Sequence, residues 1–131
     1  MSDNQRTACD RDIRLESFAA ELTSAVYPLV LRRGPKDSWL KMELGLWRAL
    51  AETVKKWARE RPPAGSPDEF EAWREGLLVD LTAGALSVAV QHGIHGPLRE
   101  VELGLYRALR PVIRRVGQEA LRCQVATVRY A

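Results

Sequence analysis

A chain of 131 residues, 46% apolar and 28% charged, is long enough to form one globular domain around its own core. Its net charge of +3, with 16 Arg and four Lys set against 17 dispersed acids, permits nucleic-acid binding without arguing for it. No apolar run approaches the roughly 18 residues of a membrane-spanning helix, so we expect no membrane partner.

The polar start of the chain, SDNQRTACDRD, lacks the apolar segment of a secretory signal. We therefore expect a cytoplasmic protein. The two cysteines, Cys9 and Cys123, form neither a disulfide framework nor a zinc-binding spacing. We expect two free thiols, although the ends of a helical bundle can lie close enough for a disulfide.

The first helical hairpin is expected over about residues 15–59. Apolar residues recur every three or four positions in both of its helices, which predicts one buried stripe on each. The stripe of the first helix is Leu15, Phe18, Leu22, Ala25 and Leu29, and that of the second is Leu40, Glu43, Trp47, Leu50, Val54 and Trp57. In the loop RRGPKDS, Gly34 ends one helix, and Asp37 or Ser38 can cap the next. Pro28 is expected to kink or interrupt the first helix.

A linker rich in proline and glycine, residues 61–69, precedes the second hairpin at about 74–118. Ser66 and Glu69 have the spacing of a capping box at its start. The predicted stripes are Leu77, Leu81, Gly84 and Val88, then Glu102, Tyr106, Leu109, Ile113 and Val116. Between them, Pro97 suits the first position of a helix, whereas Pro111 is expected to kink or interrupt the last one. The tail at 122–131 fits either a short strand or a frayed helix end.

The two hairpins share a repeated octapeptide. ELGLWRAL at 43–50 returns as ELGLYRAL at 102–109, and further matches keep the same offset of 59 residues. These matches include Phe18 with Leu77, Leu22 with Leu81, Thr23 with Thr82, and Gly34 with Gly93. We therefore predict an all-α, up-down-up-down four-helix bundle built from two duplicated helical hairpins, in one domain over 1–131.

Each repeat carries an acid within its predicted stripe. A di-metal site in a carboxylate bundle uses Glu-x-x-His motifs, but Leu46 and Leu105 stand three residues after Glu43 and Glu102. We favour a structural polar network without metal or cofactor, in which acids and arginines of neighbouring helices pair. Its predicted members are Glu21, Glu43, Arg48, Asp80, Glu102 and Arg107. Gly45 and Gly104 would allow a close approach between helices.

Candidate interaction residues lie in the loops and among the tryptophans. Up-down topology brings both loops to one end of the bundle, where loop residues commonly carry function. The loop candidates are Arg32, Arg33, Lys36, His92 and His95. Four tryptophans exceed what a small core needs, so Trp39 and Trp73 are candidates for contact with a protein partner or a second copy of the chain.

No nucleophile motif, phosphate-binding loop or dinucleotide fingerprint is present. We therefore expect a non-catalytic cytoplasmic protein-interaction module that regulates or neutralises a partner, as immunity proteins and antitoxins do. The first alternative is a nucleic-acid-associated factor with Arg-rich helix faces. Those faces hold Lys55, Lys56, Arg59 and Arg61 in one helix and Arg110, Arg114 and Arg115 in another. The second alternative is a metal-carboxylate four-helix bundle.

Overall fold

The computed structural model describes residues 3–60 and 67–117, and within these ranges it contains helices and no strand. The all-α prediction is thereby confirmed. The helices are α1 (Asp3–Arg32), α2 (Trp39–Arg59), α3 (Pro67–Gln91) and α4 (Leu98–Val112), followed by the π-helical segment η1 (Ile113–Gly117). The tail at 122–131, Ser66 of the proposed capping box, Cys123 and the side chain of Cys9 lie outside the described residues.

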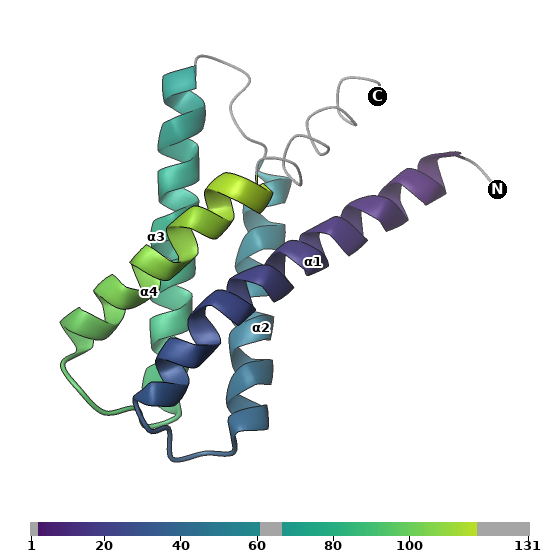
Figure 1. The fold of residues 1–131 in the computed structure, drawn as a ribbon. Coiled ribbons are helices and arrows are strands. Elements are labelled where there is room, and N and C mark those ends of the chain that lie inside the picture. Colours follow the sequence, from purple (N-terminus) through teal and green to yellow (C-terminus); the bar gives the residue numbers. More distant parts are fainter. Residues whose placement is uncertain (1–2, 61–66, 118–131) are drawn as a thin grey trace.

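The helices form two layers. α2 and α3 run side by side in opposite directions, and α1 and α4 cross in front of them (Figure 1). Contacts join α1 to α2, α2 to α3, α3 to α4 and α4 back to α1. Both hairpin loops lie at the same end of the molecule (Figure 1). Within the described ranges, no helix has the length and apolar character needed to cross a membrane.

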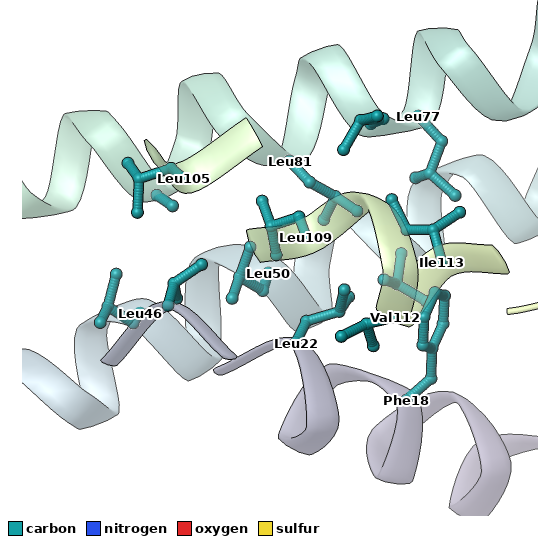
Figure 2. Close-up of a cluster of buried hydrophobic side chains, with 14 of the residues drawn as sticks. Phe18, Leu22, Leu46, Leu50, Leu77, Leu81, Leu105, Leu109, Val112 and Ile113 are labelled. Carbon is teal, nitrogen blue, oxygen red and sulfur yellow. The ribbon is translucent and has the colours of Figure 1, made fainter. Parts of the chain in front are cut away.

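One apolar row from each helix meets in a common core (Figure 2). Burial of each such side chain contributes about 1.5–3 kcal/mol, which holds the two layers together. Positions that are 59 residues apart fill equivalent places in this core. The pairs in which both side chains are fully buried include Phe18 with Leu77, Leu22 with Leu81, Val26 with Ala85, Val30 with Ala89, Leu46 with Leu105 and Leu50 with Leu109.

The buried stripes of α2 and α4 match the prediction only in their second halves, at Leu50 and Val54 and at Leu109 and Ile113. Their first halves differ from the prediction. The core uses Met42, Leu46, Leu50, Val54 and Ala58 of α2, and Val101, Leu105, Leu109 and Val112 of α4. Leu40 is 52% exposed, Glu43 and Trp47 are half-buried, and Glu102 is exposed. Both helices are apolar on more than one face, so spacing alone permitted two stripes. The core takes the stripe without an acid because burying an unpaired carboxylate is costly.

The stripe predicted for α1 is correct over its first half and then drifts. Leu15, Phe18 and Leu22 are buried, but Val26 and Val30 follow them in the core. The predicted steps average 3.5 residues, whereas an α-helix has 3.6 residues per turn, so the buried face moves around a straight helix. In α3, likewise, Ala85 and Ala89 are buried where Gly84 and Val88 were expected.

The two prolines behave differently. α1 continues through Pro28 to Arg32, so the predicted interruption is absent there. Pro111 is the next-to-last residue of α4, and the chain changes to the π-helical segment η1 directly afterwards. Proline lacks the N–H that would bond to the carbonyl four residues earlier, which favours such a break in the α-helical pattern.

Candidate functional site

An open groove of about 1080 Å³ lies between α3 and α4. The side that α3 contributes is mainly apolar, with lining residues three or four positions apart and therefore on one helix face. The α3 residues are Val79, Thr82, Ala83, Leu86, Ser87, Val90 and Gln91. α4 adds Leu103 and Tyr106, with Glu100 and Glu102 as acids along the groove. We call this surface the α3–α4 groove.

Large apolar side chains in this groove remain accessible. Val79 is 60% exposed, Val90 is 46% exposed and Leu103 is 47% exposed. A single exposed apolar residue is ordinary on a protein surface, but several lining one groove indicate a binding surface. Covering them with another apolar surface would be favourable by about 25 cal/mol for each Å² removed from water.

A hydrogen bond at the groove wall fixes the ring of Tyr106. Its hydroxyl donates to Oε2 of Glu75 over 3.0 Å, and Arg110 lies 4.0 Å from the other oxygen of that carboxylate. The bond to Glu75, followed by desolvation, raises the pKa of Tyr106 above the ordinary value of tyrosine. Tyr106 therefore presents a neutral ring to the groove at physiological pH.

A second groove, of about 610 Å³, lies between α1 and α2. We call it the α1–α2 groove. Each of its eight lining residues has a counterpart 59 positions later that lines the α3–α4 groove. The pairs are Ala20 and Val79, Thr23 and Thr82, Ser24 and Ala83, Tyr27 and Leu86, Leu40 and Arg99, Glu43 and Glu102, Leu44 and Leu103, and Trp47 and Tyr106.

Three of these pairs are identical residues. Thr23 and Thr82 are buried, and each hydroxyl donates over 2.8 Å to the carbonyl four residues earlier in its helix. Leu44 and Leu103 are each 47% exposed. The repeated octapeptide therefore has two roles: some of its leucines enter the core, while its acid, first leucine and aromatic residue line the grooves.

The α1–α2 groove is smaller and has fewer lining residues. Five residues that line the α3–α4 groove have counterparts that do not line the α1–α2 groove: Ser87, Val90, Gln91, Pro97 and Glu100. Tyr27 takes the place of Leu86, and Trp47 takes the place of Tyr106. Both replacements put a larger aromatic side chain between the helices of the first hairpin, whereas Ala20 and Leu40 are smaller than their counterparts Val79 and Arg99. The first hairpin thus has more aromatic side chains, but fewer residues in total, around its groove than the second.

The two loops are joined by a reciprocal pair of backbone hydrogen bonds. Lys36 N–H donates to the carbonyl of His92 over 2.8 Å, and His95 N–H donates to the carbonyl of Arg33 over 2.7 Å. These are the same bond with the hairpins exchanged, because each partner lies 59 residues from its counterpart. The loops also turn alike, since Gly34 and Gly93 have φ of 63° and 75°.

The loop candidates therefore lie together, with unequal exposure. Arg32, Lys36 and His95 are exposed, and Arg33 is half-buried. The side chain of His92 is only 16% exposed, and its Nδ1 lies 2.8 Å from Oδ2 of Asp37. This contact is an ion pair when the ring is protonated, but the ring nitrogen makes no aligned hydrogen bond with a described residue.

The two tryptophan candidates occupy different environments. Trp39, at the start of α2, is 59% exposed. Trp73 lies among packed rings, edge-on to Trp57 at 5.7 Å and stacked on Phe70 at 5.9 Å. Its Nε1 is buried and has no hydrogen-bond partner within the described ranges. The structure therefore offers Trp39, and not Trp73, as an accessible ring.

The six residues of the predicted polar network do not come together. Glu21 lies 3.6 Å from Arg115 at the surface, and Asp80 accepts a bond of 2.7 Å from Nε1 of Trp57. In the part of the chain that the structure describes, none of the other four (Glu43, Arg48, Glu102 and Arg107) forms an ion pair. Exposed ion pairs contribute about 0–1 kcal/mol, so the pair of Glu21 and Arg115 does little to fix the positions of the helices relative to one another.

The close approach between helices that was predicted at Gly45 and Gly104 occurs at only one of these two glycines. A Cβ on Gly45 would lie 3.2 Å from Cγ1 of Val88 and 3.4 Å from Nε2 of His92. A Cβ on Gly104 would meet nothing within 4 Å. The hairpins thus differ in how closely their second helix approaches its neighbour.

The predicted acids also do not converge on one point. Among residues 3–60 and 67–117 there is no group of three or more His, Cys, Asp or Glu side chains that could hold a metal ion.

No protein-family model matches the chain, and no curated protein or solved structure matches it either. The grooves are therefore the surface from which a function can be argued.

Sequence patterns alone did not reveal the grooves, although they gave the offset of 59 residues and the acid at the same place in each repeat. The missing step was that Leu44 and Leu103 are repeated beside those acids, on a helix face that the core does not use. The sequence signal for the grooves was that the second helix of each hairpin has two apolar stripes, one of which contains the acid.

Proposed function

We propose that the protein is a non-catalytic, cytoplasmic protein-interaction module whose α3–α4 groove binds an amphipathic helix of a partner. Such a module would regulate or neutralise that partner. The observation that carries the proposal is the exposed apolar row of the groove, flanked by two acids of α4. A bundle of two duplicated, up-down hairpins is part of the proposal. The ring of helix contacts and the reciprocal loop bonds support it.

The shape of the groove suits a helix as its occupant. Its lining on α3 runs from Val79 to Gln91, a length of roughly 18 Å at 1.5 Å per residue. About three turns of a partner helix would lie along that length. The groove is open and bordered by two helices, so a third helix would enter it with apolar side chains at positions i, i+3, i+4 and i+7.

The charge of the groove indicates the flank of that helix. Glu100 and Glu102 both line it, and neither forms an ion pair with a described residue. Arg99 is the only basic side chain among the lining residues of the described groove. A helix with Lys or Arg beside its apolar face would therefore be favoured. Such exposed charges select partner and orientation more than they add affinity.

A titration with model peptides tests the proposal. The probe is an 18-residue amphipathic Leu/Lys peptide, added to ¹⁵N-labelled protein and followed by NMR. We expect shifts to concentrate at residues 79–91 and 99–106. A Leu/Glu helix of the same pattern should bind at least about tenfold more weakly, and a scrambled Leu/Lys peptide, which has no apolar face, should do the same.

A pair of variants links binding to the groove. Ala83→Arg places a long cationic side chain in the α3–α4 groove and should abolish binding of the Leu/Lys peptide to this groove, so that the shifts at residues 79–91 and 99–106 are lost. Ala72→Arg, on an exposed position of the same helix that does not line the groove, should leave binding unchanged. Equal binding by both variants, or shifts confined to other surfaces, would show that the proposal is wrong.

The nucleic-acid alternative is less well supported because several of its cations already face acids. Lys55 lies 3.7 Å from Glu16, and Arg110 lies 4.0 Å from Glu75. Arg115 is likewise paired with Glu21. A cation that is paired in the free protein gains less from a phosphate. Binding to mixed-sequence DNA or RNA that falls steeply with added salt would favour this alternative.

A further inference from the structure

We infer that the α1–α2 groove is a second site of the same kind, so that one molecule binds two copies of the same amphipathic helix. This inference rests on the proposed function, because it assigns to the first hairpin what is proposed for the second. Its basis is the match of all eight lining residues of the α1–α2 groove with lining residues of the α3–α4 groove.

Packing of the core does not explain why Leu44 is repeated at Leu103 and Glu43 at Glu102. Leu44 and Leu103 remain 47% exposed and lie outside the core, and Glu43 and Glu102 beside them form no ion pair in the described ranges. Substitutions at such surface positions usually change stability little. A leucine beside a glutamate at both places is what two sites for one ligand chemistry require.

The reciprocal loop bonds relate the two sites in space. If each residue is replaced by its counterpart 59 positions away in the other hairpin, the bond from Lys36 to His92 becomes the bond from His95 to Arg33. The two hairpins are therefore related by an approximate two-fold axis at the loops. The same exchange carries one groove onto the other. Two bound helices would therefore lie in equivalent orientations on the two hairpins. A partner that contains two identical helices related by a two-fold axis could occupy both grooves.

The chemistry of the second site follows from its own residues. Glu43 supplies the acid next to Leu44, so the occupant again has a basic flank beside its apolar face. The groove has a volume of about 610 Å³, and Tyr27 and Trp47 are among its lining residues. Less apolar surface of the helix can be covered there, so the α1–α2 groove binds the helix more weakly than the α3–α4 groove.

The test uses matched variants of the full chain and the same Leu/Lys peptide, with stoichiometry from calorimetry and location from NMR. The wild-type protein should bind two peptides. Leu44→Glu should bind one, with shifts confined to the α3–α4 groove, and Leu103→Glu should bind one, with shifts confined to the α1–α2 groove. The control, Ile13→Glu, also replaces an exposed apolar side chain, since Ile13 is 59% exposed. Neither Ile13 nor its counterpart Ala72 lines a groove. The control should still bind two.

The outcomes separate this inference from the proposed function. One peptide on the wild type, abolished by Leu103→Glu and unaffected by Leu44→Glu, would overturn the second site and leave the proposed function standing. No shifts in either groove would overturn both. If Leu44→Glu instead dissolves a dimer of the free protein, a second copy occupies the α1–α2 groove and the inference is wrong. Circular dichroism of each variant confirms that the helices are retained.

Discussion

The first and second hairpins share a buried framework and differ on their outer faces. Phe18, Leu22, Leu46 and Leu50 have fully buried counterparts 59 residues later. The loop bonds and the threonine bonds are repeated as well. The groove of the first hairpin is smaller and is lined by Tyr27 and Trp47, whereas that of the second is larger.

This difference separates what the fold requires from what it leaves free. Core positions have to stay apolar, although their size differs between the hairpins, as at Phe18 and Leu77 or at Val26 and Ala85. In the loops, Gly34 and Gly93 are repeated because both have a positive φ. Groove positions are free to change in charge as well as in size. Four of the eight pairs differ in this way: Ala20 with Val79, Tyr27 with Leu86, Leu40 with Arg99, and Trp47 with Tyr106. The acid and the leucine that persist at these free positions are therefore the most informative residues.

The largest expected effect tests whether the two halves of the core are equivalent. Leu50→Ala and Leu109→Ala each remove a fully buried side chain from matching places. Each should reduce the free energy of unfolding by about 2–5 kcal/mol, because a cavity is left in addition to the lost burial. Urea unfolding followed by circular dichroism measures this. A cost near zero for one of them would show that only one hairpin builds the core.

The loop glycines come next. Gly34→Ala and Gly93→Ala force a side chain into the left-handed region, at φ of 63° and 75°, and should each cost about 1–2 kcal/mol. Gly93→Ala should cost more, because its Cβ would lie 3.0 Å from Cδ of Lys36, whereas the closest atom to a Cβ on Gly34 is 3.4 Å away.

Asparagine is the matched control for these loops, since it tolerates the left-handed conformation better than alanine. Gly34→Asn should therefore unfold at a higher urea concentration than Gly34→Ala. If alanine and asparagine were equally tolerated at this position, backbone conformation would not be the reason for the repeated glycine.

A smaller effect distinguishes the helix glycines. Gly104→Ala should stabilise the protein by about 1 kcal/mol, because alanine favours a helix and nothing lies within 4 Å of the new methyl group. Gly45→Ala should gain less, since Val88 and His92 must move away from its Cβ. Thermal and urea unfolding of both variants measure the difference. Equal gains would mean that α2 and α3 are not close at Gly45.

The smallest effect concerns a bond that the first hairpin lacks. Trp47, the counterpart of Tyr106, has no hydroxyl for an equivalent of the bond to Glu75. The stabilisation from that bond is present while the phenol is protonated, and it is lost as the pH rises through the raised pKa of Tyr106. Glu75→Gln should lower that pKa, as measured by the ultraviolet absorbance of tyrosinate. Tyr106→Phe identifies the titration, and an unchanged curve in Glu75→Gln would contradict the bond.

The chain by itself determined the number of helices, the loops between them and the equivalence of positions 59 residues apart. These features depend on local signals, such as Gly34 in a loop and apolar residues every three or four positions, which act within a few residues of chain. It did not determine which stripe of α2 is buried, because Leu40, Leu44 and Trp47 have the same helical period as Met42, Leu46 and Leu50.

Only the tertiary structure decided that question and, with it, the candidate site. Packing α2 between α1 and α3 buries the acid-free stripe and turns Glu43, Leu44 and Trp47 toward the α1–α2 groove. The same packing turns Glu102 and Leu103 into the α3–α4 groove. Periodicity specifies the faces of a single helix, but which face is buried depends on the competition among all faces for a limited core, and that is a property of the whole assembly.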